Sequence, residues 1–61
     1  MAKRLRILRR RRRLSQQTLA DKAGISRPYL ARLELGQQDP TLGILEKLAK
    51  ALRVKVTRLL E

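Results

Sequence analysis

Apolar side chains recur along this chain at spacings of three and four residues, which is the period of an amphipathic helix. The pattern predicts five short helices, with expected ranges of roughly Lys3–Arg12, Gln16–Ala23, Arg27–Leu35, Leu42–Leu52 and Thr57–Glu61. In the first four helices the inward-facing positions are Leu5 and Leu8, Leu19, Ala20 and Ala23, Leu30 and Leu33, and Leu42, Leu45, Leu48, Ala49 and Leu52. The expected fold class is all-α, a compact bundle of five short helices in a single domain covering residues 1–61.

The stretches between the expected helices contain residues that end or begin helices. Gly36 fits the left-handed position that follows a helix, and Thr41 is a candidate N-cap. Val54-Lys55-Val56 alternates as a strand does, but the chain offers no partner strand, so we interpret it as a connector.

Two serines mark the starts of the second and third helices. Ser15 and Ser26 each precede a helical pattern, and a serine hydroxyl that caps a helix stabilises it by about 1 kcal/mol. Gly24 lies between them, and Pro28 falls in the first turn of the third helix, where its missing amide has no intrahelical partner. Two capped helices that meet at a tight corner form a helix-turn-helix, whose second helix can enter the DNA major groove.

The third helix has an outward face that can contact base edges. Leu30 and Leu33 hold this helix on the core, which leaves Arg27, Pro28, Ala31 and Arg32 pointing away. Arginines at the start of the helix and one turn later suit the guanine edge. Ordinary solvated arginines are the alternative for both, and simple helix initiation is the alternative for Pro28.

The composition excludes several kinds of site. The chain has no cysteine and no histidine, and its five acidic residues are scattered singly. Disulfides, thiolate metal sites and histidine-based catalysis are therefore absent, and no pair of acids suggests a catalytic dyad. We expect no enzyme activity, no metal, no cofactor and no small-molecule ligand.

The net charge of +11 favours a polyanionic partner. Half of the sixteen basic residues lie within residues 1–13, which contain no acid. The run Arg10–Arg13 is most simply a solvated helix face that attracts phosphates diffusely, and Arg11 and Arg12 are the expected phosphate contacts. No apolar run approaches membrane-spanning length and no signal-peptide core follows the basic start, so the expected location is cytoplasmic, or nucleoid-associated when the protein is bound to DNA.

Taken together, the motifs resemble the lambda-repressor-like helix-turn-helix family of the Cro and phage-repressor type. The similarity runs from Leu5 to Leu60, nearly the entire chain. The family pattern appears as Leu5-x-x-Leu8-Arg9, Leu14-Ser15-Gln16-x-x-Leu19-Ala20, Gly24-Ile25-Ser26, Leu30-x-x-Leu33-Glu34-x-Gly36, Pro40-Thr41-Leu42 and Leu48-Ala49-x-Ala51-Leu52-x-Val54.

The resemblance implies roles for particular residues. Base contacts are expected from Arg27, Pro28 and Arg32, with Ala31 on the same face. Phosphate contacts are expected from Gln16 and Gln17 at the start of the second helix and from Gln37 and Gln38 in the loop after the third helix. They are also expected from Tyr29, for which packing against the second helix is the alternative. Arg9 and Glu34 match a structural ion pair between the first and third helices. Leu59 and Leu60 are expected at a dimer seam, with closure of the core as the alternative.

Three positions depart from the family pattern. Arg13 stands where the family often has a glycine after its first helix, so we expect this helix to end differently. Gly43 replaces a common acidic residue in the first turn of the fourth helix. The loop Gln37-Gln38-Asp39 lacks the lysines common there, which suggests that phosphate attraction has moved to the N-terminal arginines.

The leading hypothesis is a sequence-specific double-stranded DNA-binding regulator of transcription, with a repressor favoured over an activator. Occlusion of a promoter and contact with polymerase are both open as its mechanism. The regulator would act as a homodimer on a two-fold operator whose half-sites lie about 34 Å apart. One alternative is an antitoxin-type module that binds a protein partner and its own operator. Another is a non-specific binder of RNA or anionic membrane, against which the single aromatic residue argues because bases stack on aromatic side chains.

Overall fold

The computed structural model describes residues 1–61 and contains five α-helices and no strand. Their bounds are α1 (Ala2–Arg11), α2 (Gln16–Ala23), α3 (Arg27–Glu34), α4 (Leu42–Leu52) and α5 (Val56–Leu60). The all-α prediction is confirmed, and α2 and α4 have the expected bounds. The other three helices differ from the prediction by one residue at one or both ends, which is ordinary fraying.

A single aliphatic core joins all five helices. It consists of nine leucines and three alanines, with relative exposures of 9% or less. Ala20 and Ala23 of α2 and Ala49 of α4 carry small side chains, and α2 and α4 form the most extensive helix pair in the molecule. Close packing of small and large side chains gives a domain with a radius of gyration of 9.8 Å.

One predicted core position is wrong. Leu42 is 66% exposed, because it is the first residue of α4 and lies beyond the end of the core. The buried face of α4 begins at Leu45. Hydrophobic periodicity cannot locate where a helix leaves the core, since it describes only the direction of a side chain around the axis.

The predicted N-caps are confirmed at three helices. The hydroxyls of Ser15, Ser26 and Thr41 accept hydrogen bonds from the backbone amides three residues later, at 3.0, 3.2 and 3.2 Å. Each hydroxyl satisfies an amide that the helix itself leaves unpaired.

Four helix ends share one geometry. Arg13, Gly24, Gly36 and Arg53 have positive φ values of 55°, 69°, 74° and 57°. The residue after each donates its amide to a carbonyl five residues earlier, at 2.9–3.2 Å, as in a Schellman motif. The expectation that α1 ends differently is therefore wrong. The turn at Arg13 directs Leu14 against the core, and this burial offsets the left-handed strain of an arginine.

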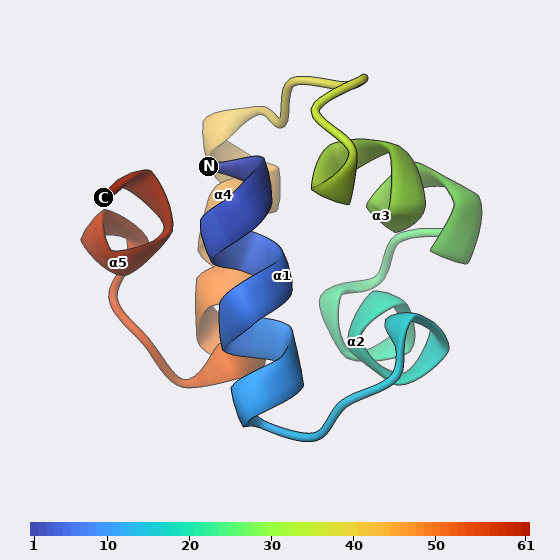
Figure 1. Ribbon diagram of the computed structural model, residues 1–61, viewed down its shortest axis with the longest axis horizontal. Coiled ribbons are helices and arrows are strands. Elements are labelled where there is room, and N and C mark those ends of the chain that lie inside the picture. Colours follow the sequence, from blue (N-terminus) through green and yellow to red (C-terminus); the bar gives the residue numbers. More distant parts are fainter.

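The helices are arranged so that α3 has one free side. Figure 1 shows α1 and α4 in the middle, α5 on one side and the corner formed by α2 and α3 on the other. α1 packs against α3 and α5, and α4 packs against α2 and α5. With α1 and α2 behind it, α3 presents its remaining face to solvent. None of the helices is long and apolar enough to cross a membrane.

Candidate nucleic-acid interface

The outer face of α3 carries a group of exposed side chains. Arg27, Pro28 and Arg32 are exposed, and Ala31 between them is half-buried. Pro28 and the Ser26 cap fix the start of the helix, so the first turn is well defined. The structure thus brings the four predicted base-contacting residues onto one face, where two guanidinium groups are free to donate paired hydrogen bonds to an acceptor such as a guanine edge.

Arg32 lies against the only aromatic ring of the chain. Its guanidinium carbon is 5.9 Å from the centre of the Tyr29 ring, one helical turn earlier, which is within cation–π range. Tyr29 is itself half-buried and packs against the core. One side of the ring is therefore held by the scaffold, and the ring restricts the positions that Arg32 can adopt.

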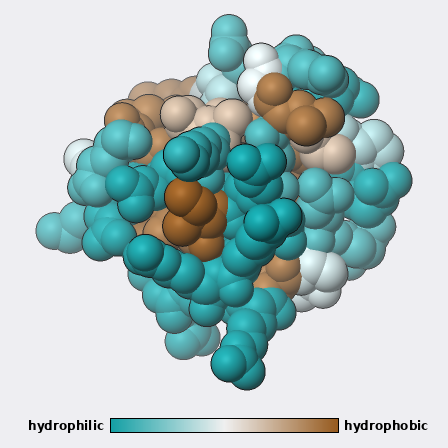
Figure 2. Space-filling view, viewed as in Figure 1, coloured by the Kyte–Doolittle hydropathy of each residue, from teal (hydrophilic) through white to brown (hydrophobic).

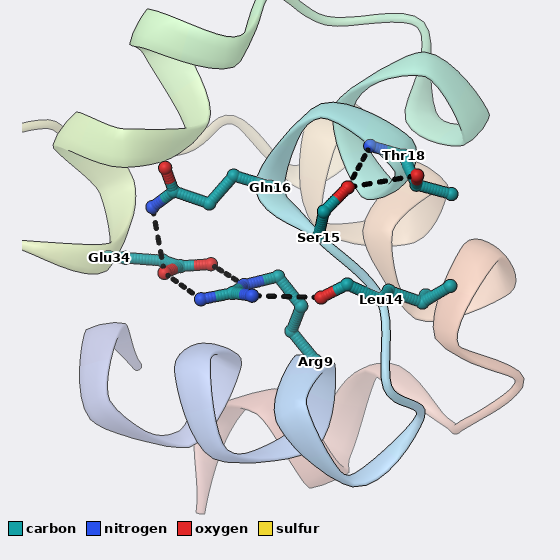
Figure 3. Close-up of polar contacts among 6 residues, drawn as sticks. All are labelled: Arg9, Leu14, Ser15, Gln16, Thr18 and Glu34. Atoms are coloured by element: carbon teal, nitrogen blue, oxygen red, sulfur yellow. Dashed lines mark hydrogen bonds and ion pairs between the residues drawn. The ribbon is translucent and has the colours of Figure 1, made fainter.

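A polar network fixes α3 from behind, as Figure 3 shows. Arg9 Nε donates to Glu34 Oε2 at 2.7 Å, and Arg9 Nη2 donates to Glu34 Oε1 at 3.1 Å. Arg9 Nη1 donates to the Leu14 carbonyl at 2.8 Å. The Arg9 and Glu34 side chains are only 12% and 3% exposed. This bidentate pair joins α1 to α3 and, through Leu14, to the chain entering α2.

Gln16 belongs to the same network. Its Nε2 donates to Glu34 Oε1 at 3.1 Å, so the first residue of α2 is tied to the last residue of α3. Sequence reasoning expected a phosphate contact here and missed the contact with Glu34. Gln17 is exposed, and its Nε2 donates to Asp21 Oδ1 at 2.9 Å along α2. The Glu34 carboxylate receives three donated hydrogen bonds, and no buried side-chain polar atom of the molecule lacks a partner.

The other predicted phosphate contacts lie on either side of α3. Gln37 and Gln38 are exposed in the loop between α3 and α4, next to the exposed Asp39. In Figure 1 this loop lies above α3, and α2 lies below it. Arg11 and Arg12 are exposed at the carboxyl end of α1. A surface that includes α3 is thus flanked by polar side chains on one side and by cations on the other.

The two residues expected at a dimer seam are separated by the structure. Leu59 is fully buried in the core of its own chain, so it is not available to a second copy. Leu60 is 59% exposed on α5. Successive helical residues point about 100° apart, and on α5 this turns Leu60 away from the core that Leu59 enters.

Arg53 was not singled out by sequence reasoning. It occupies the left-handed position after α4, and Arg12 Nη2 donates to its carbonyl at 3.4 Å. A usable signal exists, because Arg53-Val54 repeats the arrangement of Gly24-Ile25, in which an apolar residue follows the left-handed one. No three carboxylate side chains cluster in a way that could hold a metal ion.

Comparisons with known proteins agree with this geometry. The helix-turn-helix family pattern matches residues 5–59. The immunity repressor protein of Bacillus phage phi105 is 40% identical over 57 residues, which make up 93% of this chain and 40% of that repressor. The chain spans less than half the length of the curated relatives it matches.

Two solved structures share the whole arrangement of helices. The restriction-modification controller protein C.AhdI from Aeromonas hydrophila has a TM-score of 0.93 and 41% identity, and the match covers 95% of this chain and 88% of that one. SinR, a master regulator for biofilm formation whose structure was solved in complex with DNA, has a TM-score of 0.93 and 34% identity, with coverage of 98% and 97%. The chain therefore belongs to the lambda-repressor-like helix-turn-helix family.

Proposed function

We propose that the chain is a transcriptional regulator that binds double-stranded DNA at specific sequences, with α3 as its recognition helix. The observation that carries the proposal is the pairing of a free, arginine-bearing face of α3 with a buried Arg9–Glu34 pair behind it. A helix held rigidly by its inner side can place its outer side chains at fixed positions in a major groove. Relatives named as repressors and regulators, and a DNA complex of SinR, support the same function.

In this proposal Arg27 and Arg32 read bases, and Pro28 and Ala31 make apolar contacts with them. Each guanidinium is positioned to donate two hydrogen bonds to the O6 and N7 atoms of a guanine. Tyr29 limits the freedom of Arg32, so less conformational entropy is lost when Arg32 binds a base. The sequence preference then comes from the outer face of α3.

Phosphate contacts position this face on the duplex. Gln17 is exposed at the start of α2, and Gln37 and Gln38 are exposed beyond the other end of α3. The second hydrogen on Gln16 Nε2 and the amides at the start of α2 are also suited to a phosphate oxygen. Contacts with the phosphate backbones of both DNA strands fix the position of α3 along the groove without specifying sequence.

A homodimer on a two-fold operator completes the proposal. The exposed Leu60 on α5 is the apolar side chain that we assign to the contact between the two copies. Half-sites would lie about one helical turn apart, roughly 34 Å. Occlusion of a promoter, as a repressor acts, requires nothing more than this occupancy.

The test is selection of bound duplexes from a random pool, followed by affinity measurements on variants. Arg27→Ala and Arg32→Ala should each weaken binding to the selected site by about 1–3 kcal/mol while changing affinity for random DNA far less. Arg58→Ala is a matched control, because Arg58 is exposed on α5 and pairs only with the C-terminal Glu61 at 3.7 Å. Equal losses on selected and random duplexes would refute base reading and would favour a non-specific polyanion binder.

A further inference from the structure

Two of the four left-handed residues at the helix ends are arginines. The other two are Gly24 and Gly36, and their φ values of 69° and 74° carry no steric cost because glycine has no Cβ atom. Arg13 and Arg53 adopt φ values of 55° and 57°, where a Cβ atom crowds the backbone. Glycine would be the favoured residue for folding at both positions, so the two arginine side chains are candidates for a role other than folding.

The two arginines lie at one corner of the molecule. Arg12 Nη2 reaches the carbonyl of Arg53 at 3.4 Å, so the carboxyl ends of α1 and α4 adjoin. Six exposed cations, here called the basic corner, lie on these ends and on the connector that follows α4: Arg10, Arg11, Arg12, Arg13, Arg53 and Lys55. Figure 1 places this corner at the lower end of the molecule, and Figure 2 shows hydrophilic side chains projecting there.

The basic corner has no anionic partner within the chain. The ion pairs of the structure involve Arg4, Arg9 and Arg58, none of which belongs to it. Single cations near the carboxyl end of a helix are explained by the helix dipole. Six unpaired cations at two adjacent helix ends repel one another, so this arrangement fits an external polyanion.

The opposite side of α3 lacks a comparable charge. The loop from Gly36 to Thr41 contains one acidic residue and no basic one. The basic corner, by contrast, leads through Leu14 directly into Ser15 at the start of α2. Cations therefore gather on the α2 side of the α2–α3 corner. The loop side has fewer, because the loop itself carries none and only the amino end of α1, with the exposed Lys3, adjoins it at Gly36.

We propose that the basic corner binds the phosphate backbone of DNA that flanks the recognised base pairs on the α2 side, where cations are concentrated. The footprint of each protein chain is then lopsided, extending further past one edge of its half-site than past the other. The inference rests on the proposed function, since a half-site is needed to fix the orientation of the protein. The contacts are to phosphates, so they raise affinity and salt dependence without adding sequence preference.

The experiment uses duplexes that carry one selected half-site and are lengthened with random sequence on one side or the other. Lengthening the duplex on the α2 side of the half-site should raise affinity about tenfold or more at low salt. It should also steepen the dependence of affinity on salt concentration, because further counterions are released. Lengthening the duplex on the side of the α3–α4 loop should change affinity less than about twofold. Equal gains from both sides would overturn the inference while leaving the proposed function intact, and a failure to prefer the half-site over random DNA would overturn both.

A double variant assigns the gain to the basic corner. Arg53→Gly with Lys55→Gln removes two of the six cations, and glycine tolerates the left-handed conformation at position 53. This variant should reduce the slope of log affinity against log salt concentration, the salt slope, by about two, because each phosphate contact contributes roughly 0.9. The matched control is Lys22→Gln with Lys47→Gln, two exposed lysines that line a hollow between α2 and α4.

Thermal unfolding separates binding from folding. The double variant should unfold at the same temperature as the parent chain or higher, since a strained arginine has been replaced by glycine. The control variant should still bind the duplex lengthened on the α2 side more tightly than the short duplex. A double variant that retains the full salt slope, or a control that loses as much of it, would overturn the assignment to the basic corner.

Discussion

Removal of the Glu34 carboxylate should destabilise the chain more than any substitution on its surface. Glu34 is 3% exposed and receives two hydrogen bonds from Arg9 and one from Gln16. Glu34→Ala leaves the Arg9 guanidinium, 12% exposed, with the Leu14 carbonyl as its remaining partner. Breaking a buried pair from one side costs about 3–5 kcal/mol.

The total stability of so small a domain makes this loss decisive. At about 0.05–0.15 kcal/mol per residue, a chain of 61 residues has a free energy of unfolding of about 3–9 kcal/mol. Glu34→Ala therefore removes between about a third of the stability and all of it. The measurement is urea denaturation followed by far-UV circular dichroism at constant ionic strength.

Two further variants decide whether the unpaired charge is the cause. Glu46→Ala removes an exposed carboxylate on α4 that forms no ion pair, and its effect should stay within about 0.5 kcal/mol. Arg9→Met combined with Glu34→Leu replaces the pair with apolar groups and should be more stable than Glu34→Ala alone. The reasoning is refuted if Glu34→Ala costs less than about 1 kcal/mol, or if the double variant recovers nothing.

Further substitutions test the core, a cap and a strained turn. Leu59→Ala should cost about 2–5 kcal/mol in urea denaturation because Leu59 is fully buried, whereas Leu60→Ala should change stability little and should instead weaken any dimer seen by sedimentation. Ser26→Ala should cost about 1 kcal/mol by the same assay, and Ser26→Asp should keep the cap, since a carboxylate also accepts the Tyr29 amide. Arg13→Gly should stabilise the chain by on the order of 1 kcal/mol in thermal unfolding, and a lower midpoint would show that φ 55° carries no strain.

The helices could be predicted from the sequence because their determinants are local. Ser26 and the amide that it caps are three residues apart, and the same holds for Ser15 and Thr41. The apolar period likewise needs only neighbouring turns. The errors arose where the answer depends on how far a helix extends past its neighbours, as at Leu42, or on which of two adjacent leucines faces the core, as at Leu59.

The ending of α1 shows a different limit. The preference for glycine at position 13 concerns only the backbone conformation of that residue. The observed turn also packs Leu14 against the core. The backbone strain at Arg13 and the burial of Leu14 together decide how α1 ends, and the structure shows that the burial outweighs the strain. The same compensation holds at Arg53, which is followed by the half-buried Val54.

The candidate site was predictable on its outer face and less so behind it. Arg27 and Arg32 follow from helical periodicity once Leu30 and Leu33 are assigned to the core. The bond from Gln16 to Glu34 joins residues 18 positions apart, and the contact of Arg12 with Arg53 joins residues 41 apart. A side chain with several possible partners is assigned only by the packing that selects one of them.

On the proposed function, the fold separates sequence preference from stability. Arg27 and Arg32 are exposed and form no ion pair within the chain, so their replacement should change folding free energy by no more than about 0.5 kcal/mol. Gln16 and Glu34 hold the same helix from its buried side and cannot change so freely. Base preference can therefore diverge at the outer face of α3 while the network behind it stays fixed, and the charge of the basic corner supports whichever sequence is read, because phosphates are the same at every site.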